Sequence, residues 1–247
     1  MAYRRKKKNN FIKIASTVIA IIIAILGALF VIPDGDPGND APISLDSIPE
    51  YSGTCYVAIN GNVPFFTEDE YTTESYEKYS DLDSLGRCGV AMACISKDTM
   101  PAKDEERESI SSVTPSGWVQ KKYDSSLVSG GYLYNRCHLI GWQLTAENAN
   151  EKNLITGTRY FNAGNSEEQG MLTFENMVAD YIKETGNHVL YRVTPIYEGS
   201  NLVASGLLME GYSVEDGGEG ISFCVYFYNV QPGIVIDYAT GESRLAD

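Results

Sequence analysis

Hydrophobic and polar positions follow three patterns along the chain, and the first is an unbroken apolar stretch near the N-terminus. Ile14 to Ile32 is a run of 19 uncharged residues, preceded by the basic cluster RRKKK. At about 1.5 Å per residue, a helix of this length spans roughly the 30 Å hydrocarbon core of a bilayer. Basic residues collect on the cytoplasmic side of membranes. We therefore predict a cytoplasmic tail at residues 1–10, a transmembrane anchor in the lipid bilayer at residues 11–32, and an extracellular remainder.

A cleaved secretory signal is the alternative interpretation of the same segment. Signal peptides have a shorter apolar region, about 7–15 residues, followed by small residues at the cleavage site. Here the stretch is longer and ends in Leu-Phe-Val-Ile-Pro, without an A-x-A pattern. The anchor is therefore favoured, with secretion after cleavage as the alternative, and both interpretations export the rest of the chain.

A linker and one globular domain follow. Residues 33–50 hold four of the nine prolines and have no apolar period, which is typical of a linker. The remaining residues, 51–247, form the predicted domain. Its first half shows two strand-like stretches, an acidic segment with helical character near its end, and a polar segment that we expect to be a long surface loop; these are Cys55–Phe66 with a turn at Asn60–Asn62, Arg87–Ile95, residues 67–86 and residues 97–118.

The second and third patterns, periods of 3.6 and of two residues, occupy the second half. Apolar residues recur at helical spacing from Phe174 to Ile182, with Thr173 as a candidate N-cap and Gly186 as the stop. Three stretches with strand character follow, separated by turn compositions, and they predict an antiparallel meander: His188–Tyr197, Asn201–Val214 and Ile221–Val230. Strands early, a helix in the middle and strands late indicate an α+β fold with a mainly antiparallel sheet.

The charge of the predicted domain opposes a polyanionic partner. The chain has 19 basic and 33 acidic residues, and six of the basic residues lie within residues 1–32. Residues 33–247 therefore hold 13 basic against 33 acidic residues, a formal charge of −20. Nucleic-acid binding draws its affinity from Lys and Arg, so such a partner would require a local concentration of basic groups.

The five cysteines show no C-x-x-C pair, and their spacing with the two histidines matches no usual zinc pattern. An odd number leaves at least one thiol outside any intramolecular disulfide. We expect most of them to be small buried hydrophobic residues, and the sequence leaves their pairing open.

Each of the two histidines can be weighed separately. His188 follows a helix stop at the start of a strand, where a histidine needs no function. His138 lies in the stretch YNRCHLIGW, and it is either a histidine packed in a strand or a general base, since its ordinary pKa lies near operating pH. Arg136, two residues earlier, shares its strand face and could bind an anion.

Three stretches carry a resemblance to a known family: NRCHLIGWQL, EKNLITGTRYFN and LTFENMVADYIKETGNHVLYRVTPIY. Together they resemble the DNA/RNA non-specific endonucleases, most of all the DNA-entry nuclease branch. The resemblance implies a ββα-metal nuclease core that hydrolyses DNA, with RNA as a further substrate, using Mg²⁺, or Mn²⁺ in its place. It assigns His138 as the general base, Asn162 as the metal ligand, Asn153 as a second active-site asparagine, and Glu175 as the acid near the metal-bound waters.

The sequence departs from the family motif at two of its four positions. Asn135 and Cys137 stand where the family has Asp and Gly. A glycine needed for positive φ could not be replaced without strain, so an ordinary β conformation at Cys137 is required if the site is intact. Basic residues near the motif are candidates for contacts with substrate phosphate, namely Arg136, Arg159 and Lys152, with Lys121 and Lys122 shortly before it.

Two other functions are weighed against the nuclease. A Cys-His hydrolase is disfavoured because Cys137 and His138 are adjacent in a strand and point to opposite faces. A membrane-tethered, non-catalytic binding domain on a decayed nuclease fold is the main alternative. The joint presence of His138, Asn153 and Asn162 favours the enzyme. The sequence gives no indication of oligomeric state.

Overall fold

The computed structural model describes residues 42–247. The predicted cytoplasmic tail, the transmembrane anchor and the first half of the predicted linker lie outside these residues. Within residues 42–247, no helix has the length and apolarity needed to cross a membrane. The last residues of the predicted linker pack on the domain, because Ile43, Leu45 and Ile48 contact a buried cluster around Tyr226. The packed part of the chain thus extends to the N-terminal side of Tyr51.

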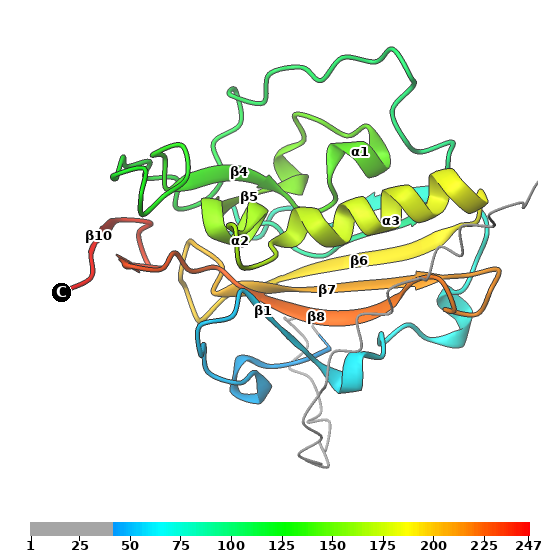
Figure 1. Cartoon of the computed structure of the whole chain (residues 1–247), viewed down its shortest axis with the longest axis horizontal. Coiled ribbons are helices and arrows are strands. Elements are labelled where there is room, and N and C mark those ends of the chain that lie inside the picture. Colours follow the sequence, from blue (N-terminus) through cyan, green and yellow to red (C-terminus); the bar gives the residue numbers. More distant parts are fainter. Residues whose placement is uncertain (1–41) are drawn as a thin grey trace, which may run out of the picture. The chain divides into compact units, whose positions relative to one another are not determined.

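An antiparallel sheet of six strands, in the order β1-β8-β7-β6-β3-β2, forms the centre of the fold (Figure 1). The predicted meander is confirmed, since β6 pairs with β7 and β7 with β8. The six strands of the sheet are β1 (Tyr56–Ala58), β2 (Tyr76–Tyr79), β3 (Ala91–Ile95), β6 (Val189–Ile196), β7 (Gly206–Ser213) and β8 (Ser222–Tyr228).

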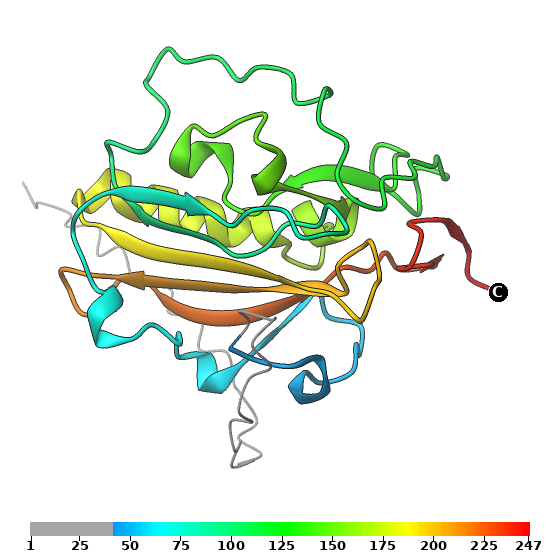
Figure 2. The ribbon, with the colours of Figure 1, turned by 180° about the vertical axis from the view of Figure 1, so that it is seen from behind.

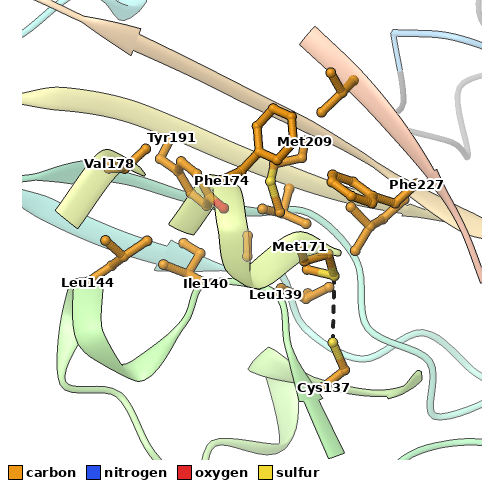
Figure 3. Close-up of a cluster of buried hydrophobic side chains, with 14 of the residues drawn as sticks. Cys137, Leu139, Ile140, Leu144, Met171, Phe174, Val178, Tyr191, Met209 and Phe227 are labelled. Atoms are coloured by element: carbon orange, nitrogen blue, oxygen red, sulfur yellow. Dashed lines mark hydrogen bonds between the residues drawn. The ribbon is translucent and has the colours of Figure 1, made fainter. Parts of the chain in front are cut away.

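Both faces of this sheet are buried, which explains why its strands are apolar at most positions. Helix α3 (Met171–Thr185) lies along one face, where the ring of Phe174 packs edge-on against Phe223 and Phe227 at centroid distances of 5.1 and 5.4 Å. Figure 3 shows Phe174 among the buried residues between helix and sheet. The opposite face is covered by N-terminal residues around Phe65 and Ile59.

A ββα unit lies beside α3 and outside the main sheet (Figure 1). Strands β4 (Tyr134–His138) and β5 (Leu154–Thr158) pair with each other alone, and α2 (Arg159–Ala163) follows β5 directly. A single-turn helix, α1 (Trp142–Thr145), connects to a 3-10 turn, η4 (Glu151–Asn153), before β5. This unit carries most of the residues that the sequence nominates for chemistry.

Several predicted boundaries are wrong. Helix α3 begins at Met171 with Gly170 as N-cap, three residues before the predicted start. A Cβ on Gly170 would lie 2.3 Å from the backbone nitrogen of Gly164, so a close backbone approach fixes this helix start. The Gly186 stop is confirmed, with φ of 79°. Strand β3 begins at Ala91 rather than Arg87, because Arg87 closes a turn on Asp83.

The helical character expected near the end of residues 67–86 is also wrong. That segment contains the 3-10 turn η3 (Glu68–Glu70) and then β2, which pairs with β3 at the sheet edge. Residues 97–118 form the long loop that was predicted, and it arches over α1 in both views (Figures 1 and 2). The turn predicted at Asn60–Asn62 is the 3-10 turn η2 (Asn60–Asn62). Short elements without a clear sequence pattern are η1 (Leu45–Ser47) and the hairpin of β9 (Ile234–Ile236) with β10 (Ser243–Leu245).

All five cysteines are buried and unpaired with one another. The expectation that most of them act as small buried hydrophobic residues is confirmed. Burial raises the pKa of the Cys137 thiol well above its ordinary value, so this residue is a poor candidate for a nucleophile.

Candidate active site

Strand β4 places His138 at the edge of the ββα unit, and the backbone there is ordinary. Cys137 belongs to β4 and is not among the described residues with positive φ. The change from glycine to cysteine therefore introduces no backbone strain. Helix α2 is fixed against the hairpin by Thr158, whose side chain accepts a hydrogen bond from the backbone nitrogen of Phe161. This cap orients Asn162 on α2.

His138 is 6% exposed and both of its ring nitrogens have partners. Nε2 lies 2.8 Å from the carbonyl oxygen of Asn148; since a carbonyl only accepts, Nε2 carries the proton. Nδ1 therefore has the free lone pair, and it lies 3.2 Å from Nη2 of Arg107. The pKa of His138 is lowered to about 4, mainly by burial and less by the charge of Arg107, while the hydrogen bond to Asn148 acts in the opposite direction. The imidazole is neutral at pH 7.

A cleft of about 620 Å³ is lined by three arginines and no carboxylate. His138 is not one of its lining residues, but it contacts one of them, Arg107. Arg107 enters it from the long loop, Arg136 from β4 and Arg159 from the start of α2. Its other lining residues are polar or apolar and uncharged, namely Ile110, Trp118, Gln120, Tyr132, Tyr134, Asn135 and Asn162. Three guanidinium groups around one opening form a site for an anion with several oxygens.

One cleft arginine, and one lysine that contacts a cleft residue, lie over aromatic rings. The guanidinium carbon of Arg136 lies 4.4 Å from the ring centroid of Trp118, and this arginine also donates to the backbone carbonyls of Val113 and Ser111. At the rim, Lys122 lies over Tyr132, which is 49% exposed. An exposed ring beside cations can stack on a nucleobase.

Asn162 is the one residue assigned to the metal, and its surroundings suit a hard cation. Its side-chain oxygen accepts a hydrogen bond from Sγ of Cys137 at 3.1 Å. No three His, Cys, Asp or Glu side chains gather into a ligand cluster anywhere within residues 42–247. Asn162 is one of the residues that line the cleft, and an amide oxygen fits Mg²⁺, which keeps several of its waters and takes substrate phosphate as a ligand.

Asn153 is completely buried, and its amide is fully used in holding Ile140. Its oxygen accepts from the backbone nitrogen of Ile140 and its nitrogen donates to the carbonyl oxygen of the same residue, at 2.9 and 3.0 Å. These two bonds tie the start of β5 to the residues directly after His138. The structure thus gives Asn153 a positioning contact.

Glu175 is buried in the second turn of α3, one turn further into the helix than the sequence suggested. Nε2 of Gln143 donates to its carboxylate at 2.9 Å. Burial raises the pKa of Glu175 to about 7, against smaller lowering effects of Gln143 and Arg107. A Cβ at Gly141 would lie 2.7 Å from this carboxylate, so a glycine is needed there.

Two basic residues of the sequence analysis have partners away from the cleft. Lys152 forms an ion pair with Asp81 at 2.6 Å on the surface and does not line the cleft. His188 pairs with Glu215, also at 2.6 Å, which agrees with a histidine that needs no catalytic function. Arg136 and Arg159 do converge with Asn162.

Sequence reasoning missed Arg107, Tyr132, Trp118 and Gln143 as parts of this region. Arg107 lies among four acidic residues in the stretch DEERE, and such a segment is ordinarily a solvated surface. Only the path of the long loop brings its guanidinium to His138. Tyr132 follows two glycines, ten residues after Lys122, and no local pattern indicates that its ring lies beside that lysine.

The chain resembles known nucleases in both sequence and structure. The family model for DNA/RNA non-specific endonucleases matches residues 67–215. A deoxyribonuclease of Streptococcus dysgalactiae subsp. equisimilis is 27% identical over 208 residues, which is 71% of this chain and 62% of that relative. The chain therefore spans less than two thirds of that relative's length.

Two solved structures have a similar fold. NucA from Streptococcus agalactiae with magnesium bound has a TM-score of 0.64 and 25% identity, covering 76% of this chain and 86% of NucA. Sda1 nuclease with bound zinc has a TM-score of 0.63 and 28% identity, covering 78% of this chain and 96% of that one. The sheet-dominated, ββα-metal nuclease-like fold expected from the sequence is confirmed. This chain belongs to the DNA/RNA non-specific endonuclease family.

Proposed function

We propose that the domain at residues 51–247 is a metal-dependent endonuclease that hydrolyses the phosphodiester bonds of DNA, and of RNA as a second substrate, without reading sequence. The observation that carries the proposal is the carboxylate-free cleft, where Arg107, Arg136 and Arg159 surround Asn162 next to the neutral imidazole of His138. Guanidinium groups bind phosphate oxygens in a bidentate manner and carry no base information.

His138 is the proposed general base. Its Nε2–H is held by Asn148, so Nδ1 is the nitrogen that would take the proton from water. Arg107 occupies that lone pair in the substrate-free chain. A phosphate in the cleft is a stronger acceptor for a guanidinium than a neutral imidazole is. Substrate binding would therefore draw Arg107 onto the phosphate and free Nδ1, which couples activation of the base to the presence of substrate.

Asn162 is the proposed protein ligand of Mg²⁺, with Mn²⁺ as an alternative ion. When bound, the ion would supply Lewis-acid stabilisation of the charge on the phosphate and on the leaving oxygen. NucA and Sda1 have been solved with magnesium and zinc respectively, which supports a divalent cation in this fold.

The remaining site residues act around this centre. Arg136 and Arg159 would hold the phosphates on either side of the scissile bond. Asn153 would act through Ile140, keeping β4 and α1 in place so that His138 keeps its position next to Arg107. Glu175 is proposed as the acid near the water shell of the ion. Its bond to Gln143 and the proximity of Arg107 are the features that support a role at this centre.

We further propose that the enzyme is anchored in the cell membrane through residues 11–32, with the N-terminus in the cytoplasm and the nuclease domain outside. The apolar stretch and the preceding basic cluster support this orientation. Protease treatment of intact cells that express the chain with tags at both termini tests it. The protease should remove the C-terminal tag and leave the N-terminal tag intact. If the whole domain with its C-terminal tag appears in the medium without protease, the chain is cleaved and secreted instead.

The enzymatic proposal is tested with the full chain purified in a mild detergent and incubated with plasmid DNA. Cleavage should require Mg²⁺ or Mn²⁺, stop on addition of EDTA, and fall about 10²–10⁴-fold in His138→Ala, the range expected for loss of a general base. Asn162→Ala should be similarly impaired, and His188→Ala is the matched control that should keep full activity. A folded chain that binds DNA but cleaves nothing with either ion at any pH would establish the non-catalytic binding domain.

A further inference from the structure

Cys137 makes a contact with Asn162 that a glycine at this position could not make. Its Sγ lies 3.1 Å from the side-chain oxygen of Asn162, 3.6 Å from the sulfur of Met171 and 3.7 Å from the carbonyl oxygen of His138. A thiol has one proton to donate. Of the three possible acceptors, the Asn162 oxygen is the nearest, so the thiol proton belongs to this contact.

The side chain of Cys137 is fixed in place by its neighbours. It points into the core, on the face of β4 opposite to His138, and lies beside Met171 in Figure 3. On the paired strand, Gly157 makes room for it, since a Cβ there would approach the Cβ of Cys137 to 2.8 Å. The thiol is therefore a rigid donor and not a mobile surface group.

Asn162, by contrast, has no other side-chain partner. Within the described part of the chain, the bond from Cys137 is the only hydrogen bond to its side-chain amide. The last torsion of an asparagine is broad and roughly two-fold, so an unheld amide exchanges the positions of its oxygen and nitrogen. A carbonyl-type oxygen has two lone pairs. The thiol occupies one and leaves the other for a cation.

We propose that Cys137 is a positioning residue for the divalent cation, because it orients the amide of Asn162 with its oxygen available to the ion. The inference rests on the proposed function, in which Asn162 is the metal ligand. Groups that orient a metal ligand typically contribute about 10–100-fold to metal affinity. At this position of the motif the chain would therefore use a side-chain donor to fix its metal ligand.

The test compares Cys137→Ala and Cys137→Ser in the full chain, without nucleic acid. Neither variant has the sulfur, but serine places a smaller hydroxyl group at the γ position and keeps a donor, whereas alanine has no γ atom. Binding of Mn²⁺ is measured by the loss of its free-ion EPR signal, and folding by circular dichroism. Affinity should fall about 10-fold in Cys137→Ala and stay within about 3-fold of the original chain in Cys137→Ser.

The other outcomes separate this inference from the function on which it rests. Equal losses in both variants would show a packing effect, and unchanged or tighter binding in Cys137→Ala would show that the thiol is neutral or competes with the ion; each overturns the inference. Unchanged Mn²⁺ affinity in Asn162→Ala would instead overturn the metal assignment itself. If Cys137→Ala does not fold, Cys137→Gly replaces it, with the same expected loss.

Discussion

Two groups of arginines in this domain have opposite surroundings. On β6, Arg192 donates to both oxygens of Glu210 at 2.7 and 3.0 Å and to Glu70 at 2.9 Å, and Glu210 is completely buried. In the cleft, Arg107, Arg136 and Arg159 form no ion pair with any acidic residue in the described part of the chain. The first arginine is neutralised by the fold, whereas the other three are left for a ligand.

This difference resolves the conflict between the charge of the domain and its substrate. Acidic residues outnumber basic ones, and five of the ten Lys and Arg residues outside the cleft in the described part of the chain are paired with acids, as in Arg87 with Asp83 and Lys152 with Asp81. Positive charge remains uncompensated at the cleft. Net charge therefore says little about where a polyanion binds, because local distribution of charge sets the local potential. The surrounding acids still predict modest affinity that falls steeply with salt.

Removing the paired arginine should have the largest effect on stability. Arg192→Leu leaves the Glu210 carboxylate buried without its main partner, and breaking a buried pair from one side costs about 3–5 kcal/mol. Urea unfolding should show this loss, while DNA affinity of the folded fraction should be unchanged. A change of less than about 1 kcal/mol would mean that the network is not structural.

The neutral state of His138 predicts that stability falls in acid. The pKa of His138 is lowered to about 4 in the folded chain, against about 6.5 when unfolded. Between these two pH values only the unfolded chain binds the proton. The free energy of unfolding therefore has its full contribution from the neutral His138 above pH 6.5 and loses it as the pH falls towards 4. The shift corresponds to about 3 kcal/mol.

Unfolding measured from pH 7.5 to 4 in the original chain and in His138→Gln checks this. The raised pKa of Glu175, about 7, gives a slope of the opposite sign between its unfolded value and 7, and taking the difference between the two chains cancels it. An identical pH dependence in both chains would contradict the buried, neutral imidazole.

Variants of Arg107 show whether this arginine helps catalysis by binding phosphate or inhibits it by blocking Nδ1 of His138. If substrate phosphate takes this guanidinium, Arg107→Ala should lower kcat/KM for DNA by about 100-fold, the effect of losing one donor to a developing charge. Arg107→Lys should retain part of the activity, because it keeps the charge without the fork geometry. Higher activity in Arg107→Ala would show instead that the contact with Nδ1 only blocks the base.

The sequence predicts best those features that repeat locally. The 3.6-residue period and the Gly186 stop predicted α3, because burial of one helix face leaves a regular pattern. Strand-forming stretches between turn compositions predicted the meander, although its strands are buried on both faces and do not alternate between buried and exposed residues. His138, Arg136, Asn162 and Arg159 were found through a motif confined to one hairpin and its following helix.

The remaining features depend on pairings between distant segments. Lys152 meets Asp81 across 71 residues, and no local pattern distinguishes it from Arg159, which does line the cleft. Arg107 reaches His138 only through the path of a loop. Strand β2 has only four residues, follows an acidic segment and lies at the sheet edge, where its pairing with β3 decides its conformation more than its composition does.

Lys152 gives the smallest expected effect. Its side chain is paired with Asp81 on the surface, so Lys152→Gln should change DNA affinity by less than about 2-fold, since exposed pairs contribute little. Fluorescence anisotropy with a labelled duplex checks it. If Lys152→Gln lowers DNA affinity as much as Arg159→Gln does, Lys152 contacts substrate phosphate, as the sequence suggested.

The central claim, that the unpaired arginines of the cleft are the DNA-binding charges, is tested most directly by the salt dependence of binding. Affinity of the full chain for a short duplex is measured in EDTA, so that no cleavage occurs, over a range of salt concentrations. Each of Arg107→Gln, Arg136→Gln and Arg159→Gln should reduce the slope of log K against log salt by about 0.9, the value for one phosphate contact. The control Lys183→Gln, whose lysine pairs with Asp180 on α3, should keep the original slope. An unchanged slope in all three arginine variants, or an equal reduction in the control, would contradict the account.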